Sequence, residues 1–157
     1  LKPQPVKPSP LAVQAIKQAD LVVISPGSLY TSILPNLIIP QIGQALKQCS
    51  AKIVYVCNVM TQAGETTDYS ASDHIQAIHD HIGGACIDGI IVHNQPIKET
   101  VRNVYAKENA TPVMNDIDVL RKMGIQVIEG DIVEYKQSIV RHNTKTVAQL
   151  LYNFLTD

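Results

Sequence analysis

The sequence lacks the features that mark several large classes of protein. Its three cysteines, Cys49, Cys57 and Cys86, form no CxxC pair, which argues against a disulfide framework and a zinc knuckle. The 13 Lys and Arg residues are balanced by 14 Asp and Glu residues, with no dense basic run, so nucleic acid and anionic membranes are not expected partners. No apolar run approaches the roughly 20 residues of a transmembrane helix, and the start of the chain lacks a signal-peptide pattern. We therefore expect a cytoplasmic location.

Motifs of well-known catalytic sites are also missing. Neither GxGxxG nor the P-loop GxxxxGK[ST] occurs, and HExxH is absent. His74 and His81 share one face of an expected helix with core-like residues between them, while His79 points elsewhere, so we expect no metal at these histidines. No Ser-His-Asp or Cys-His constellation can be assigned from spacing. The catalytic residues therefore stay unknown, and the sequence leaves open whether the protein is an enzyme.

What the chain does contain is a regular alternation of apolar strands and helices. With 157 residues, 45% of them hydrophobic, the chain is long enough for one domain with a real core. We expect helices at 10–19, 72–82, 97–107 and 116–123. Apolar runs at 20–24, 53–57, 87–92 and 125–128 read as strands that are buried on both faces. This alternation predicts an α/β fold with a mostly parallel sheet covered on both faces.

Three further segments have a less definite pattern. Residues 33–47 are helical in composition but contain Pro35 and Pro40, so we expect two short helices or one kinked helix. Residues 129–140 look like a polar hairpin or an edge strand. Residues 144–155 look like a closing helix, with Asn143 or Thr144 as its cap.

The first three strands end in polar residues. They are followed by Ser-Pro-Gly-Ser at 25–28, Asn-Val-Met-Thr at 58–61 and His-Asn at 93–94. Since ligands of open parallel sheets bind at the carboxyl ends of the strands, these residues should meet on one edge. We expect Gly27 to allow a tight turn and Ser28 to cap the next helix, where uncharged donors could attract a phosphate. An ordinary capped turn would explain Gly27 and Ser28 equally well.

The loop after the second strand is longer than usual for such units. It spans residues 61–72 and contains Glu65, Asp68 and Tyr69, with Asp73 in the first turn of the following helix. Long loops in compact domains are often functional. A solvated loop with a helix-capping acid would account for Asp73 but not for the length. Near the carboxyl terminus, Arg141 precedes the closing helix and could hold a phosphate or carboxylate.

Three long motifs resemble the YvcK family, often called gluconeogenesis factor. They read ADLVVISPGSLYTSILPNL, VYVCNVMTQAGETTDYSASDH and IVRHNTKTV, and the similarity covers most of residues 9–157. The family is related to CofD, the 2-phospho-lactate transferase of deazaflavin coenzyme synthesis. The resemblance implies a Rossmann-like three-layer αβα protein of the bacterial cytoplasm that binds nucleotide sugars such as UDP-N-acetylglucosamine and is linked to gluconeogenic growth, cell-wall synthesis and cell shape.

The resemblance also implies a set of ligand-binding residues. Gly27, Ser28, Tyr30 and Thr31 would lie along the diphosphate. The sugar side would be lined by Asn58, Thr61, Glu65, Asp68, Tyr69 and Asp73. Tyr105 and Arg141 would contact the ligand from the carboxyl-terminal half of the chain.

The glycine-rich GGGTG-type turn that begins the family does not occur here. We therefore expect this chain to be a single α/β domain, 1–157, from the carboxyl-terminal part of a longer YvcK/CofD-like protein, with a tendency to form homo-oligomers. Its affinity for nucleotide sugar should be weak on its own. Two functions compete: a nucleotide-sugar-binding metabolic regulator without a certain cofactor, and a CofD-like transferase in which Asp68 or Asp73 would hold Mg²⁺ at the diphosphate.

Overall fold

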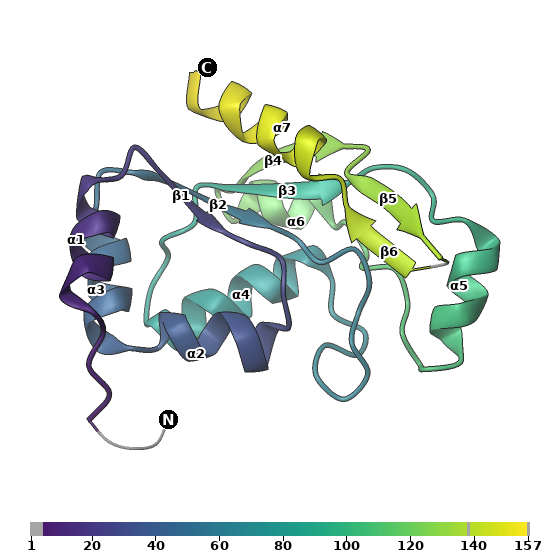
Figure 1. Cartoon of the computed structure of the whole chain (residues 1–157), viewed down its shortest axis with the longest axis horizontal. Helices are drawn as coiled ribbons and strands as arrows, with labels where there is room; N and C mark the ends of the chain where they lie inside the picture. Colours follow the sequence, from purple (N-terminus) through teal and green to yellow (C-terminus); the bar gives the residue numbers. More distant parts are fainter. Residues whose placement is uncertain (1–4, 138, 157) are drawn as a thin grey trace.

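The centre of the protein is a four-stranded parallel sheet. The computed structural model describes residues 5–137 and 139–156. The strands are β1 (Leu21–Ile24), β2 (Lys52–Val56), β3 (Gly89–His93) and β4 (Gln126–Gly130), hydrogen-bonded in the order β1-β2-β3-β4. All three pairings are parallel. The predicted α/β fold with a parallel sheet is confirmed (Figure 1).

Helices cover both faces of this sheet. Most lie on one face: α1 (Pro10–Gln18), α2 (Leu34–Leu37), α3 (Pro40–Gln48), α4 (Ala71–Ile82) and α6 (Ile117–Lys122). They pack against side chains such as Ile53, Tyr55 and Ile90. The other face is covered by α7 (Thr144–Thr156), whose Phe154 packs with Val54 and Ile91. Because successive side chains of a strand point to opposite faces, the continuous apolar runs supply both cores.

The prolines of residues 33–47 separate two helices. A short π-helical turn, η1 (Leu29–Ile33), leads into α2, and Pro35 lies in the first turn of that helix. Pro40 is the first residue of α3. Proline is tolerated at these positions because the first amides of a helix have no partner within it. Of the two expectations, two short helices is the correct one.

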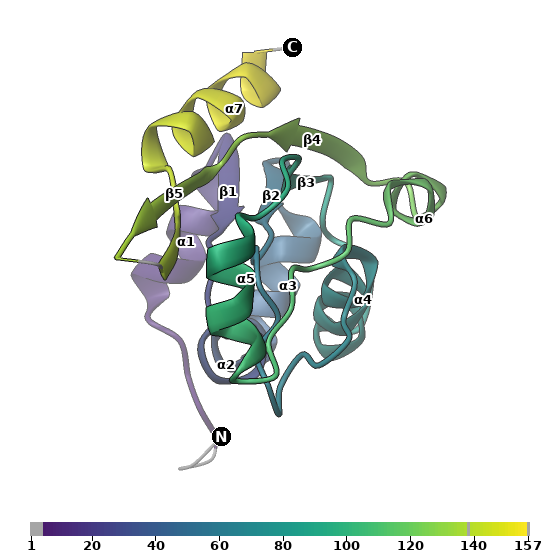
Figure 2. The same cartoon turned by 90° about the vertical axis from the view of Figure 1, so that its right-hand side faces the viewer.

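The hairpin lies later in the chain than predicted. Glu129 belongs to β4, and the hairpin consists of β5 (Val133–Lys136) and β6 (Ile139–His142), paired antiparallel. The apolar side of the hairpin packs on α5 (Glu99–Ala106) through a small cluster that includes Val101, Tyr105 and Val140. The hairpin and α5 therefore form a wall beyond the carboxyl ends of the strands (Figures 1 and 2).

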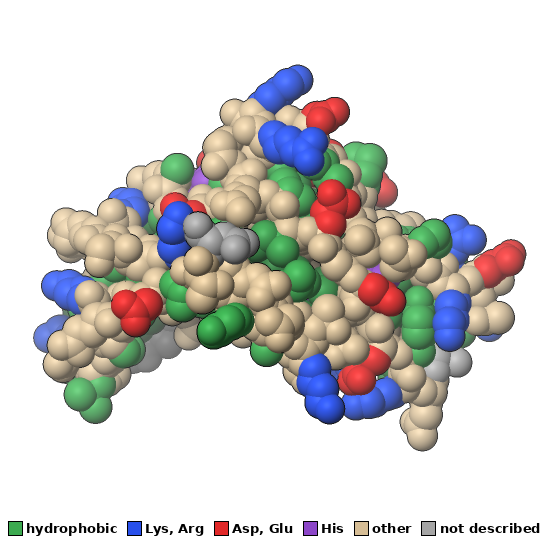
Figure 3. All heavy atoms as spheres, turned by 90° about the horizontal axis from the view of Figure 1, so that it is seen from above, with side chains coloured by type: hydrophobic (Ala, Val, Ile, Leu, Met, Phe, Trp, Pro, Cys, Tyr) green, Lys and Arg blue, Asp and Glu red, His purple; other side chains and the backbone are tan. Residues whose placement is uncertain are grey.

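Two surface properties bear on possible partners. On the face that carries α7, Lys and Arg side chains are interspersed with Asp and Glu side chains (Figure 3). Within residues 5–137 and 139–156, no helix is both long enough and apolar enough to cross a membrane.

Candidate functional site

A cleft of about 430 Å³ lies where β1 and β2 end, and we call it the first cleft. Four separate segments of the chain line it: the turn after β1, the loop after β2, helix α5 and strand β6. Six of the residues predicted to bind ligand lie along it, namely Gly27, Ser28, Asn58, Thr61, Tyr105 and Arg141. The expected convergence of the first two strand ends is therefore observed, and the hairpin wall adds the side chain of Arg141.

Arg141 is the cationic group of the first cleft. Its side chain is exposed on β6, and among the described residues it forms no ion pair. Guanidinium groups bind phosphate and carboxylate through two parallel hydrogen bonds. The neighbouring Tyr105 accepts a hydrogen bond from the amide of Val140 at 3.1 Å, which ties α5 to β6. The Tyr105 hydroxyl can still donate its own hydrogen to a ligand.

The side chain of Asn58 holds the turn after β1 in place. Its Oδ1 accepts from the Gly27 amide at 3.1 Å, and its Nδ2 donates to the Gly27 carbonyl at 2.7 Å. These two bonds continue the β1–β2 pairing past the ends of the strands. The polar atoms of Asn58 are thus used within the protein, so Asn58 positions the turn. Gly27 has no positive φ, and an added Cβ would meet Ser32 Cβ at an ordinary 3.5 Å, so the turn does not need glycine for its conformation, contrary to our expectation.

The carboxylate of Glu65 is bound to hydroxyl groups of the same turn. Ser28 Oγ donates to Glu65 at 2.5 and 2.8 Å, and Thr31 Oγ1 donates to it at 3.3 Å. Ser28 also caps η1, as predicted, by accepting from the Thr31 amide at 3.2 Å. The hydroxyl groups of Ser28 and Thr31, which we expected to donate to a phosphate, therefore donate to a carboxylate of the protein itself.

The loop after β2 has a second contact with η1. The hydroxyls of Tyr30 and Tyr69 lie 2.7 Å apart, and their rings are in edge-to-face contact. The hydrogen bond with Tyr69, together with some burial, raises the pKa of Tyr30 to about 12. Asp68 is exposed in the same loop with a φ of 61°. Tyr30, Thr31, Glu65, Asp68 and Tyr69 are thus on the loop and turn beside the first cleft but do not line it.

Asp73 has a structural role in the helix that follows. Its Oδ2 accepts from the amide and the hydroxyl of Ser70, each at 2.8 Å, and Ser70 Oγ accepts from the Asp73 amide. This arrangement is a capping box at the start of α4. The capping alternative therefore accounts for Asp73 fully, and Asp73 does not line the first cleft.

Several residues of the first cleft were missed by the sequence analysis. They are Pro26, Val59, Met60, Gln62, Val140 and His142. His142 Nε2 donates to the carbonyl of Cys57 at 3.0 Å, and burial lowers its pKa although this hydrogen bond opposes the shift. Nothing in the sequence indicated His142 as a site residue except that it follows Arg141. The reason is that the hairpin, which carries both residues, was predicted to end at residue 140.

Each of the three histidines of α4 forms its own hydrogen bonds with backbone groups. His74 Nδ1 donates to the Ser70 carbonyl at 2.8 Å, His81 Nδ1 donates to the Ala77 carbonyl at 2.7 Å, and His79 Nε2 accepts from backbone amides at 86 and 87. Among residues 5–137 and 139–156, no three His, Cys, Asp or Glu side chains are grouped in a way that could hold a metal ion.

The chain is similar to proteins of known family. Residues 1–133 match the family described as 2-phospho-L-lactate transferase CofD. The chain is 46% identical, over its whole length, to the gluconeogenesis factor of Bacillus subtilis (strain 168), of which it covers 50%. It is 48% identical to the gluconeogenesis factor of Halalkalibacterium halodurans over 96% of the chain, covering 47% of that protein.

A solved structure has the same fold. The crystal structure of a protein from Bacillus halodurans superimposes with a TM-score of 0.93 at 48% identity, covering 96% of this chain and 49% of the other. This chain therefore spans about half the length of the relatives that it matches.

Proposed function

This chain belongs to the CofD family, as its resemblance to YvcK and CofD proteins indicated, and we propose that its first cleft binds a nucleotide sugar of the UDP-N-acetylglucosamine type. In this proposal the protein is a metabolic regulator of gluconeogenic growth and of cell-wall synthesis and cell shape. The name gluconeogenesis factor, carried by the relatives, supports the metabolic part.

The observation that carries the proposal is the position of Arg141. Arg141, Ser28 and Tyr105 all line the first cleft, and the guanidinium of Arg141 is exposed. The three residues come from three separate parts of the chain, namely β6, the turn after β1 and α5. A diphosphate in this cleft would be bound by charge and by hydroxyl donors, without a lysine. Ser28 and Gly27, the latter held by Asn58, would lie along the diphosphate.

The expected affinity of this chain alone is low. Each charge-assisted hydrogen bond contributes about 1.5–3 kcal/mol, whereas association costs about 4–15 kcal/mol. A few such bonds in one cleft therefore leave little net free energy of binding. We expect a longer protein, with the glycine-rich turn typical of the family, to bind more tightly.

Binding would also affect the loop after β2. Glu65 and Tyr69 tie this loop to the turn after β1. A diphosphate that takes the hydroxyls of Ser28 and Thr31 would release Glu65 by competition and by repulsion between like charges. The loop would then present a different surface to a protein partner, which is how a bound ligand could regulate.

Calorimetry and NMR titration with UDP-N-acetylglucosamine test this function. The informative variant is Arg141→Ala, and the matched control is Arg121→Ala, which removes an exposed arginine of α6. We expect Arg141→Ala to weaken binding about tenfold or more, the equivalent of at least about 1.4 kcal/mol, and Arg121→Ala to have no effect. Equal binding by the two variants would refute the assignment of the first cleft.

The second candidate function is a CofD-like transferase that uses Mg²⁺. The observation that favours it is the oxygen-only group formed by Ser28, Thr31 and Glu65. Mg²⁺ prefers such ligands and is usually held by one or two carboxylates together with substrate phosphates. The residues therefore fit Mg²⁺ when a diphosphate is present, with Glu65 rather than the capping Asp73 as the carboxylate. When bound, the ion would neutralise charge on the diphosphate.

Product formation separates the two functions. Protein, UDP-sugar, Mg²⁺ and candidate acceptors are incubated together, and release of UDP is followed by phosphorus NMR. Turnover that Glu65→Gln abolishes would support the transferase. Binding without turnover would support the regulator.

A further inference from the structure

A second cleft, of about 400 Å³, adjoins the first one. It lies beyond the carboxyl ends of β3 and β4, and it shares Asn58 and Val59 with the first cleft. A molecule longer than one phosphate group could therefore extend over Val59 from one cleft into the other. Six residues of the predicted site line the first cleft. Of these six, Asn58 alone also lines the second cleft.

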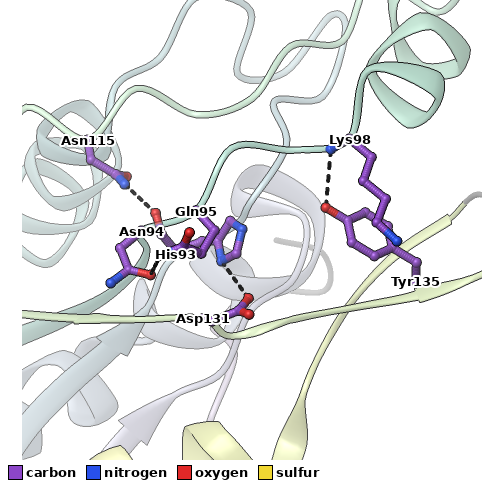
Figure 4. Close-up of polar contacts among 7 residues, drawn as sticks. All are labelled: His93, Asn94, Gln95, Lys98, Asn115, Asp131 and Tyr135. Carbon is purple, nitrogen blue, oxygen red and sulfur yellow. Dashed lines mark hydrogen bonds and ion pairs between the residues drawn. The ribbon is translucent and has the colours of Figure 1, made fainter.

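The polar groups of the second cleft are mainly amides. Gln95 Nε2 donates to Asn94 Oδ1 at 3.2 Å, and Asn115 Nδ2 donates to the His93 carbonyl at 2.6 Å (Figure 4). These bonds leave the amide nitrogen of Asn94 as a donor and the amide oxygens of Gln95 and Asn115 as acceptors. Such a set matches ligand groups that also present both donors and acceptors, such as the edge of a nucleobase, an acetamido group or sugar hydroxyls.

The charge of the second cleft differs from that of the first. Arg102 and Glu129 both line it, so its formal charges cancel, whereas the first cleft has Arg141 and no carboxylate among its lining residues. Apolar walls from residues such as Val59, Ile97 and Val113 complete it. Amide groups between apolar walls are typical of sites for neutral polar ligands.

His93 is a lining residue of the second cleft whose polar atoms are not satisfied. Its side chain is only 6% exposed, and neither ring nitrogen has a hydrogen-bond partner among the described residues. Nδ1 lies 3.7 Å from Asp131, too far for a hydrogen bond (Figure 4). A buried donor without a partner is costly, and a small displacement of the side chain that brought a ring nitrogen to a polar ligand group in the cleft would remove that cost.

From these four observations we propose that the second cleft binds the uncharged part, base or sugar, of the molecule whose diphosphate occupies the first cleft. This inference rests on the proposed function, because it concerns the same ligand. The two clefts then act as one extended site with a charged and a neutral portion. Asn58 and Val59 form the boundary between the two portions.

NMR titration of this chain with four probes tests the inference. The probes are pyrophosphate, uridine, N-acetylglucosamine and UDP-N-acetylglucosamine, each raised to millimolar concentration. We expect pyrophosphate to shift the amides of Gly27 and Ser28 but not those of Asn94 and Gln95. UDP-N-acetylglucosamine should shift the amides of all four residues, and one of the two phosphate-free probes should shift Asn94 and Gln95 alone.

A double variant gives the second measurement. Asn94→Ala with Gln95→Ala removes an exposed pair of amides, and Gln149→Ala with Asn153→Ala removes an equivalent exposed pair on α7 as the control. The Asn94/Gln95 double variant should bind UDP-N-acetylglucosamine about tenfold more weakly, and its affinity for pyrophosphate should be unchanged. The control should change neither.

The outcomes separate this inference from the proposed function. If pyrophosphate shifts the amides of Gly27 and Ser28 but no probe shifts those of Asn94 or Gln95, the proposed role of the second cleft is refuted, and the diphosphate site in the first cleft is still supported. If pyrophosphate has no effect while a phosphate-free probe still shifts Asn94 and Gln95, the neutral subsite is supported and the diphosphate assignment fails. Equal loss of pyrophosphate and UDP-N-acetylglucosamine binding in the Asn94/Gln95 variant would also overturn the inference.

Discussion

Replacing Glu65 by Gln should tighten the binding of pyrophosphate in the absence of Mg²⁺. In the structure the carboxylate of Glu65 accepts from Ser28 Oγ at 2.5 and 2.8 Å and from Thr31 Oγ1 at 3.3 Å. An anion that bound to the same hydroxyls would have to displace this carboxylate or lie beside it. The variant keeps the shape of the side chain and one acceptor oxygen, but it replaces the other oxygen by an NH2 donor and removes the charge.

The size of the effect follows from the distance between the charges. A phosphate oxygen on the Ser28 hydroxyl would lie about 4–5 Å from the carboxylate, where like charges repel by about 1 kcal/mol in water and about 4 kcal/mol at an effective dielectric constant of 20. Glu65 is half-buried, so we expect about 1–2 kcal/mol, or roughly 5- to 30-fold tighter binding. High salt should reduce the gain.

Titration by NMR or calorimetry, with and without Mg²⁺, measures this effect. Glu108→Gln, which neutralises an exposed acid beyond α5, is the matched control. Weaker or unchanged pyrophosphate binding by Glu65→Gln without Mg²⁺ would refute the competition between Glu65 and the ligand. If Mg²⁺ reverses the sign of the effect, Glu65 helps to hold the ion, as the transferase alternative requires.

Three further predictions concern stability. Asn58→Ala removes both hydrogen bonds to Gly27 and should lower the free energy of unfolding, measured with urea, by about 1–3 kcal/mol; an unchanged value would show that the turn holds without the amide. Gly89→Ala places a Cβ 3.0 and 3.1 Å from ring carbons of Phe154 and should cost about 1–3 kcal/mol, whereas Gly27→Ala, with its nearest neighbour at 3.5 Å, should cost clearly less. Burial lowers the pKa of His74 below 6.5 although its bond to the Ser70 carbonyl and the charge of Asp73 oppose the shift. The stability from neutral His74 is therefore present above about pH 6.5 and lost as the pH falls, so the melting temperature of His74→Asn should depend less on pH between about pH 7 and pH 5 than that of the unchanged protein.

The sequence was sufficient for the elements of the fold. Continuous apolar runs such as 53–57 predicted buried parallel strands because both faces of the sheet are covered, and the structure confirms them. The main error was the hairpin, which was placed at 129–140 although Glu129 belongs to β4. A polar residue at the end of an edge strand resembles the start of a loop, so the pattern of residues alone did not distinguish the two.

The proposed ligand-binding residues were predicted as a set, but the contacts that each of them forms within the protein were not. Gly27, Ser28, Asn58, Thr61, Tyr105 and Arg141 line one cleft, whereas Asp73 caps α4. Asn58 uses both of its polar atoms on Gly27. Sequence reasoning could name residues able to form hydrogen bonds at the strand ends, but it could not assign the partner of each one.

Local order along the chain therefore determined the strands, the helices and the edge of the sheet at which polar residues gather, because periodicity and capping act between near neighbours. Tertiary structure alone decided that Glu65 meets Ser28 across 37 positions and that Asn58 meets Gly27 across 31. It also decided that the hairpin brings Arg141 to the first cleft and that a second cleft adjoins it. The physical reason is that hydrogen bonds and Coulomb attraction depend on distances in space, which the packing of the sheet, α5 and the hairpin fixes.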